Sequence, residues 1–179
     1  MNEEESLLAA ISEDIRLHAY DSAWPDEFTA ERERLIALLP GSFVEVEHIG
    51  STAVPGLSAK PIIDILAGVR TLARAESLSE RICTCGGYTT SAEFNATLNG
   101  RLWFMRWANG HRTHHLHVVV HGGEVWRERV NFREALRLRP ELAARYVALK
   151  FELAQRHGTD REAYTNAKAE FVRSVLESA

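Results

Sequence analysis

Apolar side chains recur near helical spacing in the first part of the chain. Phe28, Leu35 and Leu39 follow this spacing, so residues 26–39 are predicted to form a helix that Pro40 ends. Residues 43–49 then alternate apolar and polar side chains, as a half-buried strand does. The first elements are therefore expected to be a helix followed by a strand.

A second strand is predicted from a run that is apolar on both faces. Residues 61–66 carry apolar side chains apart from Asp64, a pattern that favours a central strand, and residues 51–60 before them are rich in turn formers. Burying a carboxylate in such a strand is costly, so a capping or structural role for Asp64 is the less favoured interpretation. Asp64 is therefore a candidate functional residue.

The remaining pattern predicts one more helix between strands and then a helical tail. Residues 125–179 are helical in pattern, with a new helix beginning at Pro140 and a last one after His157-Gly158. This order predicts an α+β fold with a mixed or antiparallel sheet packed with helices. The other expected elements are a helix at 72–85, strands at 101–107 and 114–121, and a hairpin turn at Asn99-Gly100.

Composition supports a single folding unit. The chain has 179 residues, of which 45% are hydrophobic, and contains no repeat or proline-rich linker. We expect one domain over residues 18–179 after a peripheral lead-in at residues 1–17.

Charge and cysteine content limit the expected class of ligand and the expected cellular compartment. A formal charge of −4 argues against a surface built to bind nucleic acid, so phosphate recognition would have to be local. We predict a cytoplasmic protein, because the chain has only two cysteines and an acidic N-terminus. We predict no membrane segment, because no apolar run approaches ~20 residues.

Gly50-Ser51-Thr52 follows the first predicted strand. Glycine lets a ligand approach the main chain closely, so this segment can offer backbone N–H groups and a hydroxyl to a phosphate. Asp64 on the neighbouring strand can hold a divalent metal that bridges to the same phosphates. The plainer interpretation of Gly-Ser alone is an ordinary turn.

Histidines line one face of a later predicted strand. Period-two alternation places His115, His117 and His121 together, opposite apolar neighbours. Imidazoles beside Asp64 would favour zinc or manganese over magnesium, or would act as phosphate partners or proton donors. A solvent-facing polar face is an equal alternative.

Basic and aromatic residues complete the candidate site. Lys60, Arg106 and Lys150 are candidates to neutralise an anionic ligand, and Lys60 lies between the turn-rich segment and the buried strand. Trp103 and Trp107 could stack on a base, although core packing is the default interpretation of such residues.

The run from His48 to Ile65, together with His115-Leu116-His117-Val118, resembles the signatures of the GrpB family, and the likeness extends over roughly residues 18–176. It implies a nucleotidyltransferase-like fold, distantly similar to the palm of DNA polymerase β and to antibiotic-modifying nucleotidyltransferases. In those enzymes a Gly-Ser turn binds the triphosphate, and a D-x-D pair with a third acid holds two metal ions. A related domain is fused to some dephospho-coenzyme A kinases.

The sequence departs from that pattern around Asp64, because Ile62 and Leu66 stand where the second acid of D-x-D would be. The first hypothesis is a metal-dependent nucleotidyl or phosphoryl transferase acting on a nucleotide or phosphorylated small molecule. The alternative is a non-catalytic nucleotide-binding or accessory module. The predicted catalytic residues are Asp64, His117 and Lys60. The predicted ligand-binding residues are Gly50, Ser51, Thr52, Lys60, Arg106 and Lys150. A Mg, Mn or Zn ion would be bound by Asp64, His115 and His117.

Overall fold

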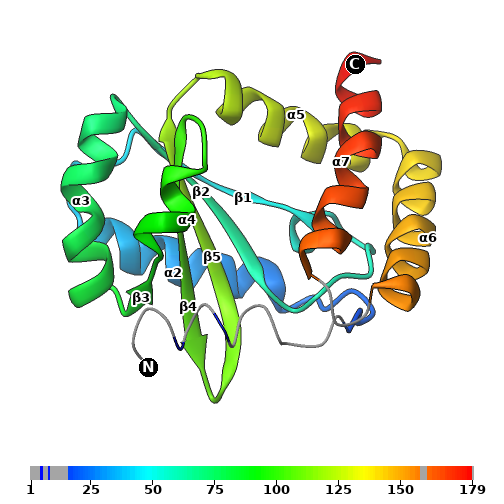
Figure 1. Cartoon of the computed structure of the whole chain (residues 1–179), viewed down its shortest axis with the longest axis horizontal. Coiled ribbons are helices and arrows are strands. Elements are labelled where there is room, and N and C mark those ends of the chain that lie inside the picture. Colours follow the sequence, from blue (N-terminus) through cyan, green and yellow to red (C-terminus); the bar gives the residue numbers. More distant parts are fainter. Residues whose placement is uncertain (1–4, 6–7, 9–15, 158–160, 179) are drawn as a thin grey trace.

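The computed structural model describes residues 5, 8, 16–157 and 161–178 (Figure 1). The lead-in predicted for residues 1–17 lies mostly outside the described residues, as does Gly158. The elements are α2 (Trp24–Leu38), β1 (Glu45–Ile49), the 3-10 turn η1 (Ser51–Ala53), β2 (Ile63–Val69), α3 (Leu72–Thr84), β3 (Tyr88–Thr89), α4 (Ala92–Ala96), β4 (Arg101–Ala108), β5 (His111–Val120), α5 (Glu124–Leu138), α6 (Pro140–Arg156) and α7 (Arg161–Glu177).

The strands form one mixed sheet in the order β1-β2-β5-β4-β3. The β2–β5 pair is parallel and the other pairs are antiparallel. Asp64 lies opposite Ile49 on β1 and opposite His115 on β5, and Leu66 lies opposite His117. The predicted α+β architecture with a mixed sheet is confirmed.

Alternation along the central strands divides the sheet into two faces. Ile65 and Leu116 pack in the main core with Leu35 of α2 and Ile82 of α3. Asp64 points to the other face, where its strand neighbour Leu66 packs with Val119 and with Trp126 of α5. The site described below lies on this second face, toward the C-terminal helices.

The three C-terminal helices pack against one another and against the segment that follows β1. Val54 and Leu57 are buried among Leu136 of α5, Tyr146 of α6 and Val175 of α7. The turn-rich segment therefore lies between the sheet and the helical tail, which α6 and α7 form beside α5 (Figure 1). Among the described helices, none combines the length and apolar character that a bilayer span requires.

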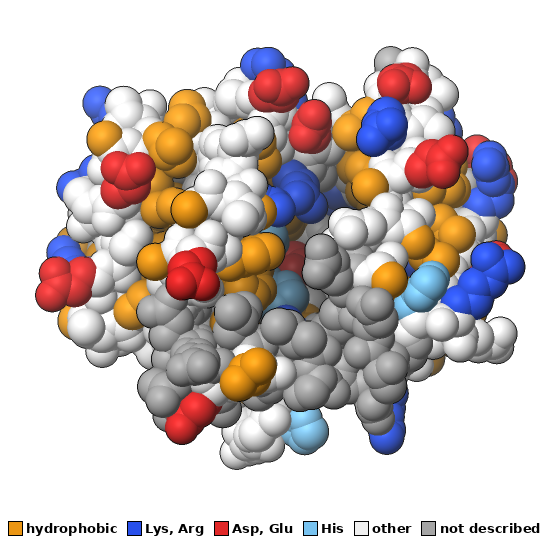
Figure 2. Space-filling view, viewed as in Figure 1, with side chains coloured by type: hydrophobic (Ala, Val, Ile, Leu, Met, Phe, Trp, Pro, Cys, Tyr) orange, Lys and Arg blue, Asp and Glu red, His pale blue; other side chains and the backbone are white. Residues whose placement is uncertain are grey.

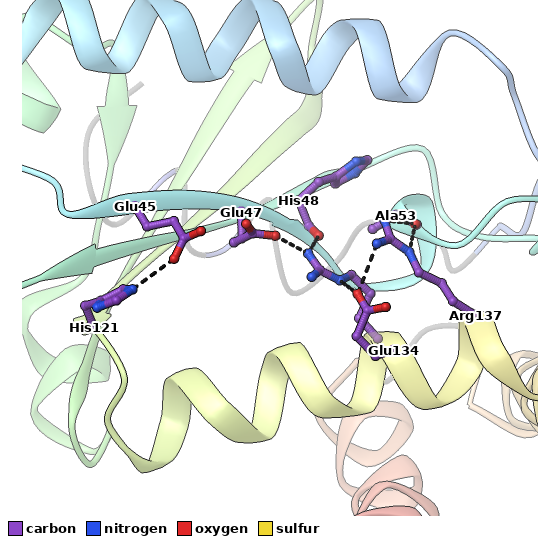
Figure 3. Close-up of polar contacts among 8 residues, drawn as sticks. Glu45, Glu47, His48, Ala53, His121, Glu134 and Arg137 are labelled. Atoms are coloured by element: carbon purple, nitrogen blue, oxygen red, sulfur yellow. Dashed lines mark hydrogen bonds and ion pairs between the residues drawn. The ribbon is translucent and has the colours of Figure 1, made fainter.

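Arginines on α5 contact the edge of β1 (Figure 3), which among the described strands pairs with β2 alone. The buried Arg133 guanidinium donates to the backbone oxygen of His48 at 2.7 Å and forms an ion pair with Glu47. Arg137 donates two hydrogen bonds to the backbone oxygen of Ala53, at 2.7 and 3.0 Å. These contacts satisfy carbonyl groups that an edge strand and its following turn would otherwise leave open.

The hairpin turn was predicted at the wrong Asn-Gly pair. The antiparallel β4 and β5 strands are joined at Asn109-Gly110, where both residues have positive φ, at 53° and 77°. Asn99-Gly100 instead links α4 to β4. The short β3 and α4 elements were not predicted, because two and five residues are too few to show a periodicity.

Candidate functional site

Asp64, His115 and His117 meet on the face of the sheet that looks toward α5. The parallel pairing of β2 and β5 brings them together, with His115 Nδ1 2.9 Å and His117 Nε2 4.0 Å from Asp64 Oδ1. One potential ligand atom from each residue lies within 4.8 Å of the other two. Their side chains are only 28%, 16% and 11% exposed, respectively.

The hydrogen bonds of His115 define its tautomer. Arg112 is placed to donate from Nη1 to His115 Nε2 at 3.5 Å, which leaves Nδ1–H to donate to Asp64 Oδ1. A cation held between Asp64 and His115 would replace this Nδ1 proton. The Nδ1 atom of His117 is buried and has no hydrogen-bond partner in the described part of the chain. An ordered water or ion would satisfy a buried polar atom of this kind, and the Nε2 atom of the same ring is the one that lies near Asp64.

The charge states suit cation binding. Burial lowers the pKa of both His115 and His117, so the imidazoles are neutral at neutral pH. Burial, the largest single effect, would raise the pKa of Asp64, but the hydrogen bond from His115 and the electrostatic effects of His115, His117 and Lys60 together outweigh it, so the pKa of this carboxyl is lowered. One carboxylate and two neutral imidazoles form a donor set that fits zinc or manganese.

Gly50 allows the turn after β1 to lie directly against Asp64. A Cβ atom at this position would be 2.3 Å from Asp64 Oδ2, and the Gly50 φ of 72° also disfavours any side chain. Ser51 therefore begins η1 immediately beside the Asp64–histidine group.

Lys150 of α6 reaches the same turn from the helical tail. Its Nζ donates to Ser51 Oγ at 3.1 Å and to the backbone oxygen of Ser58. Lys150 is only 2% exposed, and burial lowers its pKa to about 7. The Tyr146 phenol also hydrogen-bonds to Ser51, while burial raises its pKa. The serine hydroxyl is thus held by groups from α6.

Three of the 21 lysines and arginines of the chain are lysines. In the structure all three lie near Asp64 and Ser51. Lys168 Nζ lies 4.2 Å and Lys60 Nζ 5.4 Å from the centre of the Tyr164 ring. Burial lowers the pKa of Lys168 to about 8, and Asp64 interacts electrostatically with both of these lysines. The sequence analysis did not include Lys168 in the site, although the scarcity of lysine was a signal that could have identified it.

The face that carries this group is hollowed. Figure 2 shows acidic, histidine and basic side chains meeting in a depression near the centre of the view, with apolar side chains along its border. The depression lies between the sheet and the helical tail (Figures 1 and 2). A ligand bound there would contact side chains from both.

Two predicted ligand-binding residues do not join the group. Arg106 lies on the opposite face of the sheet, where its Nη1 is 2.6 Å from Glu31 Oε2. Thr52 is 1% exposed, and its hydroxyl bonds to His48 Nε2 at 3.0 Å and to the backbone oxygen of Ile62. Both side chains therefore serve the structure on the side away from Asp64.

His121 also lies apart from the other two histidines. It follows the end of β5, and its Nε2 is 2.9 Å from Glu45 Oε2 at the start of β1 (Figure 3). His121 nevertheless lies on the same face as His115 and His117, where it packs on Trp126, so the predicted alternation holds although His121 is too distant to join the Asp64 group.

The group contains one carboxylate. Ile62 and Leu66, at the positions flanking Asp64, are 5% and 0% exposed and pack in the interior. Among the described residues, Asp64, His115 and His117 form a group whose side chains could bind a metal ion, and the group has enough ligands for one cation. A pair of cations about 4 Å apart would need further ligands.

The family model for "GrpB protein" matches residues 14–178. A "UPF0157 protein" of Pseudomonas aeruginosa is 42% identical over 87% of this chain and 64% of its own length, and the "glutamate-rich protein GrpB" of Alkalihalophilus pseudofirmus is 34% identical over 91% and 94%. A "dephospho-CoA kinase" of Mycolicibacterium paratuberculosis is 28% identical over 92% of this chain and 46% of its own. The chain spans between 47% and 94% of the length of its UPF0157 and GrpB relatives.

Solved structures agree with this assignment. The crystal structure of "conserved protein GrpB" from Enterococcus faecalis has a TM-score of 0.80 and 33% identity, covering 91% of this chain and 96% of that one. Terminal uridylyl transferase 4 from Trypanosoma brucei with bound CTP has a TM-score of 0.50 at 12% identity, covering 97% and 54%, and supports the nucleotidyltransferase-like fold alone. The chain belongs to the GrpB family.

Proposed function

We propose that this protein binds a nucleotide at the hollow between the sheet and the helical tail, together with one divalent cation, and transfers its nucleotidyl or phosphoryl group. The observation that carries the proposal is the convergence of Asp64, His115 and His117 beside Ser51, with their potential ligand atoms within 4.8 Å of one another. This arrangement joins a cation site to a turn suited to phosphate.

Asp64, His115 and His117 would hold the cation. Their donor set favours zinc or manganese over magnesium, which prefers oxygen ligands. When bound, a divalent cation at this position supplies charge neutralisation on the phosphate oxygens and polarises the phosphorus–oxygen bonds.

The lysines and Ser51 would bind the phosphates. Lys150 holds the Ser51 hydroxyl at 3.1 Å, so that this hydroxyl is fixed in position at the start of η1. Lys60 and Lys168 flank the Tyr164 ring and place positive charge near Asp64. Lys60 would stabilise the negative charge that develops on the transferred group. Arg106 and Thr52 have no part in this proposal.

A second candidate function is nucleotide binding without turnover. It is favoured because buried apolar side chains, Ile62 and Leu66, occupy the positions where a second carboxylate would stand, so Asp64 is the one carboxylate of the group. In that case the same residues would bind ligand and cation, and the protein would act as a sensor or as an accessory to a partner enzyme. The similarity to part of a dephospho-CoA kinase supports testing coenzyme A precursors as well as nucleotides.

A ligand screen followed by turnover assays tests both candidates. We expect nucleoside triphosphates with Mn²⁺ or Zn²⁺ to raise the midpoint of thermal unfolding of wild type and to have little effect on Asp64→Asn. Product appearing with wild type would identify the transferase, whereas stabilisation without product would identify the binding module.

Arg106→Ala is the matched control for this screen, because Arg106 is a basic residue on the opposite face of the sheet. Its ligand response should equal that of wild type. An unchanged response in Asp64→Asn, or a loss of response in Arg106→Ala without unfolding, would count against the proposed location.

A further inference from the structure

Strand order arranges the chemistry of the site in a line across the sheet. Ser51 follows β1, Asp64 lies on β2, His115 and His117 lie on β5, and Trp103 lies opposite His117 on β4. Neighbouring strands are about 4.8 Å apart, so the line from β1 to β4 covers about 14 Å. The lysine-rich phosphate region is at one end of this line, the cation site is in the middle, and aromatic side chains are at the other end.

The aromatic end consists of Phe94 and Trp103. The Trp103 ring lies 5.4 Å from the His115 ring, and Phe94 packs edge-on against Trp103 with ring centres 5.2 Å apart. Phe94 is 39% exposed, so its ring is accessible to a ligand from solvent. The two rings therefore continue the site beyond the cation ligands.

A polar clamp holds these rings in place. Asn95 of α4 accepts a hydrogen bond from the Trp103 backbone N–H at 2.8 Å and donates one to its carbonyl oxygen at 3.3 Å. Thr90 also donates to that oxygen at 2.5 Å, and Ser91 caps α4 by accepting from the Phe94 N–H. The five-residue α4 is thus fixed to β4 through side chains, and Phe94 is held beside Trp103.

We infer that Phe94 and Trp103 form the binding surface for the nucleobase of the ligand, with its phosphates extending past the cation site to Ser51 and Lys150. The inference rests on the proposed function and adds the part of the site that would distinguish a nucleotide from inorganic polyphosphate. Flat rings stack on aromatic side chains whatever the identity of the base, so this surface selects for a base without selecting one base strongly.

The test compares two probes that share the phosphate chain. Calorimetric titration with Mn²⁺ present would measure ATP and inorganic tripolyphosphate on wild type, Phe94→Leu, Trp103→Leu and Phe151→Leu. Phe151 is the matched control, since it is 45% exposed on α6 and lines a separate surface recess with Ala154 and Gln155.

Wild type and Phe151→Leu should bind ATP more tightly than tripolyphosphate. In Phe94→Leu and Trp103→Leu the affinity for ATP should fall about tenfold, while the affinity for tripolyphosphate stays unchanged. Phe94→Leu keeps the test valid if Trp103→Leu disturbs His115 or the fold.

Each other outcome contradicts the inference in a recognisable way. Equal ATP affinities in wild type and both variants would show that the base binds elsewhere. A loss confined to turnover, with ATP affinity unchanged, would assign the rings to the acceptor and overturn the inference. Failure of wild type to bind either probe would contradict the proposed function itself.

Discussion

At the scale of single residues, the site depends on groups that have little room to change. Gly50 fits against Asp64 only because it has no side chain, and its φ of 72° with ψ of −169° is a conformation that is essentially restricted to glycine. Gly56 has a similar φ of 78°, but nothing lies within 4 Å of the position of a Cβ atom there. The two glycines therefore share a positive φ but differ in the contact that a Cβ atom would make.

Gly50→Ala should therefore be more damaging than Gly56→Ala. We expect Gly56→Ala to lower the free energy of unfolding by about 1 kcal/mol through its positive φ. Gly50→Ala should cost about 2–4 kcal/mol and also weaken Mn²⁺ binding, because Asp64 must move. Urea denaturation and metal titration would measure both effects, and equal losses in the two variants would show that the contact with Asp64 is unimportant.

The lowered pKa of Lys150 predicts that the free energy of unfolding depends on pH. Its pKa is lowered by burial from 10.5 to about 7 in the folded protein, so between these pH values the unfolded chain binds more protons at this position. The contribution of Lys150 to folding therefore becomes more favourable as pH rises through this window.

Lys150→Met should remove this contribution. The free energy of unfolding of wild type should rise more steeply between pH 7 and 10 than that of the variant, as measured by urea denaturation at several pH values. Parallel curves would mean that the lysine keeps its ordinary pKa. The variant should also bind tripolyphosphate less tightly, since Lys150 holds Ser51.

At residue scale, the sequence predicted the centre of the site better than its surroundings. A carboxylate within an apolar strand identified Asp64, and alternation identified His115 and His117. Arg106 and Thr52 could not be excluded in this way, because the face that a side chain occupies depends on tertiary partners such as Glu31. Lys168 lies far away in the sequence, and the packing of α7 brings it to this group; the scarcity of lysine was the sequence signal for it.

At the scale of elements, the attachment of α5 to the edge of β1 fixes the turn that carries Ser51. The Arg133 side chain is only 8% exposed, and it binds Glu47 and the backbone oxygen of His48. Arg137 binds Ala53, the last residue of η1 (Figure 3). These contacts were not predictable from the sequence, because charge alone does not reveal a carbonyl partner.

Removal of this attachment should destabilise the whole fold. Arg133→Met leaves Glu47 and the carbonyl oxygen of His48 without their donor, so we expect a loss of about 3 kcal/mol in the free energy of unfolding. Arg156→Ala is the control, since its ion pair with Glu152 is 67% and 52% exposed and should contribute less than about 1 kcal/mol. Chemical denaturation of both proteins would decide the matter, and similar losses would show that the α5 contacts are not special.

Elements were predictable where they were long and periodic. The helices at the N-terminus and in the tail, and the strands that carry Asp64 and the histidines, were expected close to their observed positions. The hairpin was misplaced because Asn-Gly occurs twice, and only the pairing of β4 with β5 shows that the second pair forms the turn.

At the scale of the whole molecule, the site joins the sheet to the helical tail. Asp64 and Lys60 belong to the sheet and the segment before it, whereas Lys150 and Lys168 belong to α6 and α7. A polyanion that contacts all of them would tie these parts together. The family resemblance anticipated the fold, but the alignment of groups across the sheet required the observed strand order.

Ligand binding should consequently slow local opening of the tail. In hydrogen–deuterium exchange with tripolyphosphate and Mn²⁺, peptides from α7 should become more protected in wild type, and this gain should be smaller in Lys150→Met. Peptides from α3, on the opposite face, should not change. Unaltered exchange in α7 at saturating ligand would mean that the tail does not take part in binding.

The confinement of lysine to one hollow also has a practical side. Apart from the amino terminus, the primary amines of this protein all belong to the proposed site, because every other basic side chain is an arginine or a histidine. Apart from the amino terminus, reagents that acylate amines would therefore modify only that region. Coupling the protein to a surface through activated esters would block the region under study, whereas attachment through the exposed thiol of Cys85 would leave it open.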